Sequence, residues 1–143
     1  MTEAFHIREA SWRDNQAELQ QIRDIVFIQE QHVPPELEWD EHDSSCIHLL
    51  ALDHLNKPIG TGRMLNDGHI GRMAVLPEWR HRGVGSALLR QFLEIARQRN
   101  LSHVFLYAQI TAIPFYQQHQ FEIVSEVFMD AGIPHREMRR DIA

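Results

Sequence analysis

Short apolar segments separated by turn residues dominate the first half of the chain. Their patterning predicts strands at residues 5–10, 47–53, 59–65 and 69–76. The tripeptide Asn56-Lys57-Pro58 is a turn signal, and Asn66-Asp67-Gly68 is typical of a tight hairpin. Pro77 ends the last of these strands. The pattern therefore predicts a meander of antiparallel strands in which chain neighbours pair with one another.

A long helix is predicted between the first and second of these strands. Asp14 is a suitable N-cap, and the helix is expected to run to about Gln31. Its apolar positions recur at helical spacing and form one face, comprising Leu19, Ile22 and Val26. Pro34 and Pro35 follow, and proline cannot continue a helix. The acidic, polar stretch at residues 36–45 is expected to be a loop.

The second half of the chain alternates between helix and strand. Residues 83–99 predict an amphipathic helix, because one helical face carries Val84, Ala87, Leu88, Phe92, Ile95 and Ala96. A short buried strand is predicted at residues 104–108, and a strand, crossover helix and strand of this length indicate a parallel pair. Thr111 is a candidate cap for a short helix through residue 119, with Pro114 tolerated in its first turn.

Two closing strands are predicted at residues 121–128 and 135–140, around a turn at Asp130-Ala131-Gly132. No repeat, low-complexity tract or linker interrupts the chain, so residues 1–143 are expected to form a single domain. The predicted fold class is α+β (mixed α/β), with a central, mostly antiparallel mixed sheet, one parallel strand pair and flanking helices.

Composition and charge narrow the classes of function. The 143 residues, 43% apolar and 24% charged, are typical of an ordinary globular domain. A net charge of -6 repels the phosphate backbone, so nucleic acid is a poor candidate partner. A local basic cluster at Arg80, His81 and Arg82 is still able to hold a small phosphorylated ligand.

Cysteine content and hydropathy bear on location. The single cysteine, Cys46, excludes an intrachain disulfide and favours a reducing, cytoplasmic location. The first residues lack the basic and apolar regions of a signal peptide. No apolar run approaches the ~20 residues of a membrane helix, so no membrane association is expected.

One segment has the character of a phosphate-binding turn. It lies between a predicted strand and the long helix and comprises Arg80, His81, Arg82, Gly83, Val84, Gly85 and Ser86. The two glycines allow close approach to a ligand, while the free amides and positive dipole end of the helix attract an anion. It is neither a Walker loop nor the Gly-x-Gly-x-x-Gly fingerprint, because the Gly-Lys-Ser/Thr and the third glycine are missing. The alternative is an ordinary turn with a solvated basic rim.

The pattern Arg-x-x-Gly-x-Gly, between a strand and a helix, resembles motif A of the GNAT superfamily of acyl-CoA N-acyltransferases. Further segments are similar to its ElaA-like branch: Phe27-Ile28-Gln29-Glu30-Gln31 with Val33-Pro34, Gly71-Arg72-Met73-Ala74-Val75, Ala108-Gln109, Pro114-Phe115-Tyr116 and Asp130-Ala131-Gly132-Ile133-Pro134-His135. The resemblance covers nearly the whole chain. It implies acetyl-CoA as the donor, a small-molecule amine or a protein lysine as the acceptor, and direct transfer in a ternary complex. It also allows a homodimer.

The same resemblance implies roles for individual residues. The strand at residues 72–76 would hold the pantetheine arm through backbone groups of Met73, Ala74 and Val75. Tyr116 matches the tyrosine that many GNAT enzymes have near the departing sulfur, and a phenol can donate a hydrogen bond or proton to a thiolate. The alternative for Tyr116 is a half-buried aromatic that packs beside Phe115.

Two residues are candidates for the general base that deprotonates the amine. Glu30 closes the first helix on the side where GNAT substrates often enter, and His135 follows Ile133-Pro134. A neutral histidine suits proton removal at neutral pH, but the chain has ten histidines and most are expected to be structural or exposed. Water is the third possibility.

Three further polar residues are expected near the cleft. Arg63 and Arg72 are candidates for binding an acidic group of the acceptor, with ordinary salt bridges as the alternative. Gln109 could hydrogen-bond pantetheine or the acceptor, or cap the next helix.

Other chemistries are less well supported. The stretch Glu41-His42-Asp43 with Cys46 and His48 has metal-ligand residue types but no closed zinc spacing, so no metal is predicted. Cys46 lacks a glycine-flanked elbow, so no covalent nucleophile is predicted. The main rival to a transferase is a CoA-binding sensor or interaction module with little catalytic activity, which would share the same phosphate turn.

Overall fold

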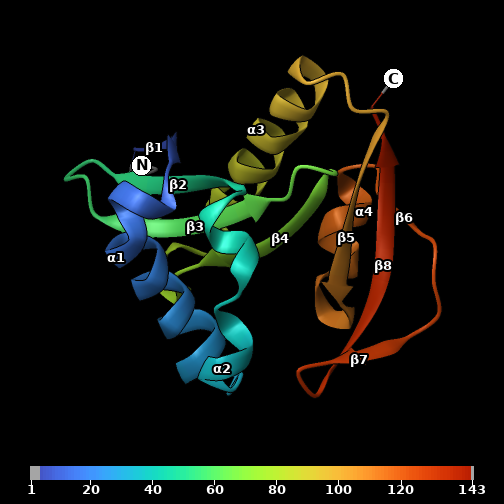
Figure 1. Cartoon of the computed structure of the whole chain (residues 1–143), viewed down its shortest axis with the longest axis horizontal. Helices are drawn as coiled ribbons and strands as arrows, with labels where there is room; N and C mark the ends of the chain where they lie inside the picture. Colours follow the sequence, from blue (N-terminus) through green and yellow to red (C-terminus); the bar gives the residue numbers. More distant parts are fainter. Residues whose placement is uncertain (1–3, 143) are drawn as a thin grey trace.

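The structure, a computed structural model, describes residues 4–142. It contains one 8-stranded sheet of order β1-β2-β3-β4-β5-β8-β6, in which β7 also pairs with β8 (Figure 1). Among the described residues, every strand pairing is antiparallel except that of β4 with β5. The predicted mixed sheet with one parallel pair is therefore confirmed. The strands are β1 (Phe5–Ala10), β2 (Ile47–Asp53), β3 (Pro58–Met64), β4 (His69–Val75), β5 (His103–Gln109), β6 (Glu122–Ile123), β7 (Phe128–Asp130) and β8 (Ile133–Asp141).

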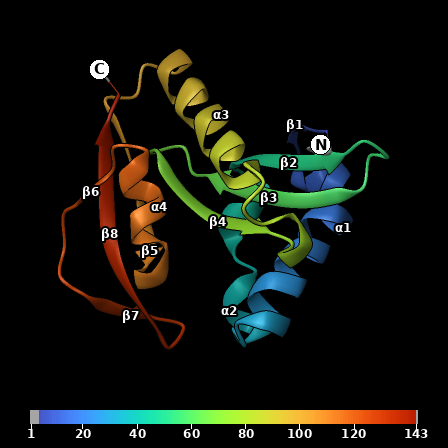
Figure 2. The same ribbon diagram turned by 180° about the vertical axis from the view of Figure 1, so that it is seen from behind.

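Helices cover both faces of the sheet. On one face lies α1 (Trp12–Arg23), which continues as the π-helical segment η1 (Asp24–Glu30). On the other face lie α3 (Val84–Gln98) and α4 (Ile113–Gln118), as Figure 2 shows from behind. None of the described helices is both long and apolar enough to cross a membrane. The short segments are α2 (Pro35–Glu38) and the 3-10 turns η2 (Glu41–Ser44), η3 (Pro77–Trp79) and η4 (Ile110–Ala112).

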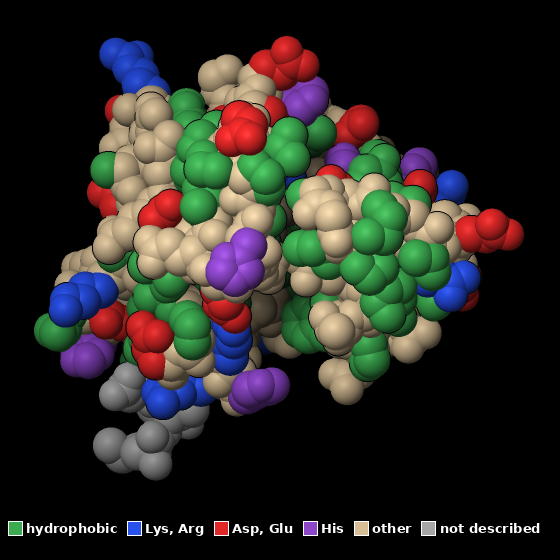
Figure 3. All heavy atoms as spheres, turned by 90° about the horizontal axis from the view of Figure 1, so that it is seen from below, with side chains coloured by type: hydrophobic (Ala, Val, Ile, Leu, Met, Phe, Trp, Pro, Cys, Tyr) green, Lys and Arg blue, Asp and Glu red, His purple; other side chains and the backbone are tan. Residues whose placement is uncertain are grey.

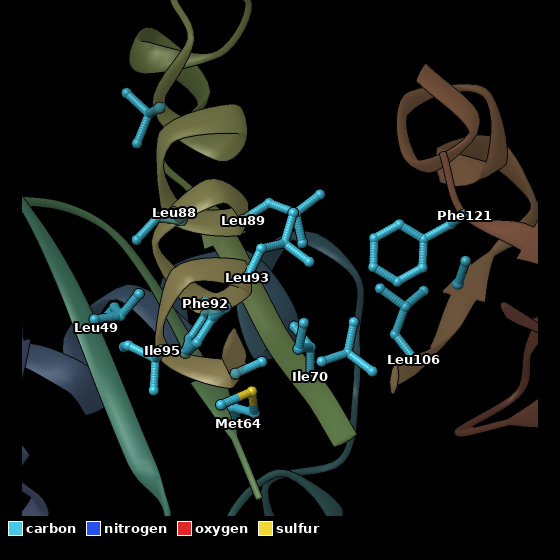
Figure 4. Close-up of a cluster of buried hydrophobic side chains, with 14 of the residues drawn as sticks. Leu49, Met64, Ile70, Leu88, Leu89, Phe92, Leu93, Ile95, Leu106 and Phe121 are labelled. Carbon is cyan, nitrogen blue, oxygen red and sulfur yellow. The ribbon is translucent and has the colours of Figure 1, made fainter. Parts of the chain in front are cut away.

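The core has two layers because β2 is buried on both faces. Leu49 and Ala51 of β2 pack with α3, whereas Leu50 and Leu52 pack with the apolar face of α1. This two-sided burial explains why β2 is a nearly continuous apolar run rather than an alternating one. The α3 layer is the larger, and its fully buried Phe92 lies among side chains from the sheet (Figure 4).

Several predicted boundaries need correction. The N-cap of α1 is Ser11 rather than Asp14, because the Ser11 hydroxyl accepts a hydrogen bond of 3.0 Å from the Asp14 amide. Thr111 lies within η4, and α4 has Ala112 as an N-cap without a side-chain bond. The strand predicted at residues 121–128 is interrupted, leaving the short β6 and β7.

The acidic stretch predicted as a loop contains α2 and η2 and carries buried charge. Asp40 caps η2 by accepting a hydrogen bond from the His42 amide, and Asp43 completes a capping box. Glu38 and Asp43 are buried beside Arg23 of α1. Arg23 Nε lies 2.8 Å from a Glu38 carboxylate oxygen, and Arg23 Nη1 lies 2.7 Å from Asp43 Oδ1. This ion cluster fastens α2 and η2 to α1.

Removing the central cation should destabilise the fold strongly. Arg23→Met leaves two buried carboxylates without their shared partner, and we expect a loss of about 3–5 kcal/mol in the free energy of unfolding. Urea denaturation followed by circular dichroism measures it. The matched control is Arg97→Met on α3, which removes an exposed ion pair with Glu94 and should cost less than about 1 kcal/mol. Equal effects of the two substitutions would contradict the structural role given to the cluster.

Candidate functional site

A cleft opens where β4 and β5 diverge. The two strands pair only at His69 with Phe105 and at Ile70 with Leu106. Beyond Ile70, β5 stays paired with β8, while the β5-facing edge of residues 71–75 has no strand partner among the described residues. The resulting cavity has a volume of about 850 Å³. Seen from below, it opens between the two halves of the molecule (Figure 3).

A β-bulge in β4 marks the point of divergence. Thr61 pairs with Ala74 and Arg63 pairs with Gly71, so two residues of β4, Arg72 and Met73, stand opposite Gly62 alone. Arg72 has a φ of 52°, a left-handed conformation that a side chain disfavours. Such a bulge bends the strand and increases its twist, which turns the end of β4 away from β5.

The predicted phosphate-binding turn lies at one end of this cleft. His81 and Gly83 have φ values of 62° and 87°, so the chain turns sharply before α3 begins at Val84. The first intrahelical bond runs from the Ala87 amide to the Gly83 carbonyl at 3.0 Å, which leaves the amides of Val84 to Ser86 ahead of the helical ladder. The cavity wall includes His81, Gly83, Val84, Gly85 and Ser86.

The two arginines of the turn differ in position. Arg80 lines the cavity, where its Nε donates a 3.0 Å hydrogen bond to the Val75 carbonyl. Its two terminal nitrogens hold the Glu30 carboxylate at 2.7 and 2.6 Å. Arg82 stacks on Trp79, with 5.2 Å between guanidinium carbon and ring centroid, and is not part of the cavity wall. The predicted ligand-facing role therefore fits Arg80 better than Arg82.

Tyr116 also lines the cavity, from α4. Its ring packs edge-on against Phe115 and Phe121, with centroids 5.0 and 5.9 Å away. Burial raises the pKa of Tyr116 to about 12, so the phenol keeps its proton at neutral pH. The packing that was one alternative on the sequence is present, and Tyr116 also lines the cleft. Its role near the departing sulfur stays a prediction.

His135 lies on β8, lines the cavity and is mostly buried. Its Nδ1 lies 2.7 Å from the Ile133 carbonyl oxygen, which only accepts, so Nδ1 carries the proton. In the neutral ring, Nε2 then has a free lone pair. The ring stacks on Phe128 at 6.0 Å between centroids.

Glu30, the other candidate base, has a different environment. It is not part of the cavity wall, and both of its carboxylate oxygens are held by Arg80. The hydrogen bonds from Arg80 lower the pKa of Glu30 below its ordinary value. A carboxylate so stabilised is a weak base, and this geometry favours His135 over Glu30.

Gln109 spans the cleft. Its side-chain amide donates a 2.8 Å hydrogen bond to the side-chain oxygen of Gln31, and both residues line the cavity. Gln109 precedes η4 but makes no side-chain cap, so the capping alternative is wrong.

Comparisons with known proteins agree with this arrangement. Residues 14–142 match the family described as acetyltransferase (GNAT) domain. The uncharacterized N-acetyltransferase YjcF of Bacillus subtilis is 39% identical over 124 residues, which cover 84% of this chain and 88% of that protein. The chain belongs to the GNAT acetyltransferase family.

Solved structures show the same fold. An acyl-CoA N-acyltransferase from Pseudomonas aeruginosa has a TM-score of 0.84 and 29% identity, covering 96% of this chain and 99% of that one. Escherichia coli ElaA has a TM-score of 0.82 and 28% identity, covering 94% and 99% of the two chains. The GNAT fold and the similarity to ElaA are therefore confirmed, and the family assignment makes this an acyl-transferring enzyme domain.

Within this GNAT domain, the two arginines predicted to bind an acidic group are already paired. Arg63 Nη1 lies 2.6 Å from Asp40 and 2.8 Å from Asp43. Arg72 Nε lies 3.1 Å from Glu38. Although burial opposes it, hydrogen bonding and charge from Arg63 lower the pKa of Asp40 to about 2, so the pair stays ionised. Both guanidiniums line the cavity, but the salt-bridge alternative describes them better than acceptor binding.

Sequence reasoning missed two residues that line the cleft and one that supports it. His69 and Tyr107 line the cavity. His119, which follows α4 and is outside the cavity wall, has its Nε2 3.0 Å from the Ser86 hydroxyl and so supports the turn before α3. The available signal for Tyr107 was its place in a predicted strand, where it faces the side opposite to Leu106 and Ala108.

The candidate metal ligands come together without forming a typical site. Ligand atoms of Asp43, Cys46 and His48 lie within 4.8 Å of one another. The Asp43 carboxylate, however, is held by Arg23 and Arg63, and burial raises the pKa of Cys46 to about 11. A protonated thiol beside two arginines is a poor ligand set, and the absence of a metal stays a prediction.

Proposed function

We propose that the protein transfers an acetyl group from acetyl-CoA to a primary amine, directly and without a covalent enzyme intermediate. The observation that carries this proposal is the continuous cleft from the open amides of α3 to the unpaired edge of β4. A pyrophosphate fits the amide-rich turn, and an extended amide-containing arm fits an unpaired strand edge. Acetyl-CoA supplies both groups and an acetyl thioester.

The donor would be held mainly by backbone groups. The amides of Val84, Gly85 and Ser86 would receive the pyrophosphate, with Arg80 adding positive charge. The edge of β4 at Met73, Ala74 and Val75, which has no strand partner although the Val75 carbonyl accepts from Arg80, would hold the pantetheine arm. It would direct an N–H group at the thioester oxygen, where negative charge develops. Gln109, at the end of β5, is close enough to the cleft to donate a further hydrogen bond.

His135 would act as the general base, and Tyr116 would donate a hydrogen bond to the departing sulfur. An alkyl amine with a pKa near ~10 is mostly protonated at neutral pH, and His135 Nε2 can accept its proton. The amine nitrogen then forms a bond to the carbonyl carbon as the carbon–sulfur bond breaks, and the electron pair leaves on sulfur. The nitrogen loses its second proton to the CoA thiolate, so that the amide and the CoA thiol are formed. Because a pKa of about 12 exceeds that of a thiol, Tyr116 would stabilise the thiolate by a hydrogen bond rather than by full proton transfer.

The primary test is acetyl-CoA binding to wild type, Gly85→Glu and Gly85→Ala. The Cβ atom added at position 85 meets only Phe115 at 3.4 Å, an ordinary contact, and a carboxylate in the first turn suits the helix dipole. Gly85→Glu should therefore fold but repel the pyrophosphate, while Gly85→Ala should still bind. Wild type should gain about 2.7 kcal/mol of stability at one hundred times the dissociation constant, measured by thermal unfolding. No saturable binding to wild type would refute the proposal.

Tyr116→Phe separates an enzyme from a CoA-binding module. The substitution removes only the hydroxyl, so turnover should fall on the order of tenfold to a hundredfold. The affinity for acetyl-CoA, measured by calorimetry, should stay nearly unchanged. Loss of affinity with unchanged kcat would instead indicate that Tyr116 serves packing.

The identity of the base is tested by a matched pair of amide substitutions. His135→Gln should lower kcat by about 10²–10⁴-fold because Nε2 is lost. Glu30→Gln should leave kcat within about twofold and lower the KM for acetyl-CoA, because Arg80 is released from its carboxylate. Steady-state kinetics with both substrates varied gives the two constants. A large fall in kcat for Glu30→Gln alone would reverse the assignment.

A further inference from the structure

A row of aromatic side chains, of which Tyr107 is exposed and the others are partly or fully buried, continues from the cleft along β5. We define this aromatic row as His69, Phe105, Tyr107, Phe128 and His135. His69 contacts Phe105 at 4.7 Å and Tyr107 at 4.5 Å between ring centroids. Tyr107 meets Phe128 edge-on at 5.3 Å, and Phe128 stacks on His135 at 6.0 Å. The candidate base His135 is thus connected to Tyr107 through the ring of Phe128.

The row lies on the face of the sheet opposite to α3. Leu106 and Ala108 of β5 are buried in the core that includes α3, so the alternation along the strand turns Phe105 and Tyr107 to the opposite face. Tyr107 is 42% exposed although its ring makes three aromatic contacts. In Figure 3, hydrophobic side chains gather on the half of the molecule that contains β5–β8, beside the opening of the cleft.

The charged side chains that line the cleft near His69 are largely paired with one another. Arg63 and Arg72 point into the ion cluster formed with Glu38, Asp40 and Asp43, while Arg23 neutralises it from the other side. Asp130 is the one cavity-lining carboxylate without an ion-pair partner among residues 4–142. A polyamine or amino sugar with several ammonium groups would therefore find little negative charge to bind.

We propose that the acceptor is a primary amine carrying one aromatic group, an arylalkylamine, and that Tyr107 determines this specificity. The proposal rests on the transferase function given above. With its nitrogen at His135 Nε2, such an acceptor would rest its ring on Tyr107 and His69, which offer a face and an edge for offset or edge-to-face contact. The reaction is the acetyl transfer already described: the nitrogen–carbon bond forms and the carbon–sulfur bond breaks, while His135 takes one proton of the ammonium and the CoA thiolate takes the second.

The test compares three acceptors and three variants. We would measure kcat/KM by release of the CoA thiol from acetyl-CoA with 2-phenylethylamine, hexylamine and spermidine. The variants are Tyr107→Ala, Tyr107→Phe and, as a control, Leu55→Ala, which removes an exposed apolar side chain from the β2–β3 turn. Acetyl-CoA binding is measured on each variant by thermal unfolding.

Wild type should prefer 2-phenylethylamine to both other amines by about tenfold. Tyr107→Ala should remove this preference while keeping acetyl-CoA binding, whereas Tyr107→Phe and Leu55→Ala should retain it. Preference for spermidine or hexylamine, no turnover of 2-phenylethylamine, or an unchanged preference in Tyr107→Ala would each overturn the proposal. In those cases intact acetyl-CoA binding would leave the transferase function standing, whereas failure of wild type to bind acetyl-CoA would overturn both.

Discussion

The site depends on one constraint: β4 pairs with β5 for only two residues and then leaves it. A parallel sheet that continued would bury the edges of both strands and leave no room for a ligand. The bulge at Arg72 and Met73 turns β4 away, and the strained φ of 52° at Arg72 is held by the buried Glu38. The ion cluster therefore does more than fasten α2 and η2. It also keeps the edge of β4 at residues 71–75 unpaired, although an exposed strand edge tends to pair with another strand.

The same ion cluster explains why the charged side chains that line the cleft, Glu38, Arg63 and Arg72, are not free to bind a charged ligand. Arg23, Arg63 and Arg72 face Glu38, Asp40 and Asp43, so burial is tolerated because each charge has a counterpart. Burial raises the pKa of Glu38 despite these arginines, while the pKa of Asp40 falls to about 2. The two opposite shifts show that Asp40 is the better stabilised anion. A cleft with such internally matched charge selects a ligand by shape and apolar contact more than by net charge.

Local signals predicted most of the fold, and distant pairings account for what they missed. The bounds of β1 and β2 follow from apolar patterning, and the β3–β4 hairpin follows from Asn66-Asp67-Gly68. The turn before α3 was predicted because its glycines and arginines lie together in the sequence, and its phosphate-binding role stays a prediction. The bulge at Arg72, the Glu30–Arg80 pair and the Gln31–Gln109 bridge involve partners far apart in the chain, which no local pattern specifies. The pairings of charged and polar side chains were therefore predicted less well than the bounds of the strands.

The two proton-handling candidates lie on opposite faces of the sheet, both on the β5–β8 side of the gap, which suits a direct transfer. Tyr116 comes from α4, on the face where α3 would hold the phosphates, and His135 comes from the face that carries the aromatic row. A donor and an acceptor that enter from opposite faces can meet only where the strands have parted. There the nitrogen would lose a proton to His135 from one face of the sheet, and the sulfur would gain a hydrogen bond from Tyr116 on the other. One opening in a sheet is then sufficient to separate the two substrates and to align their reacting atoms.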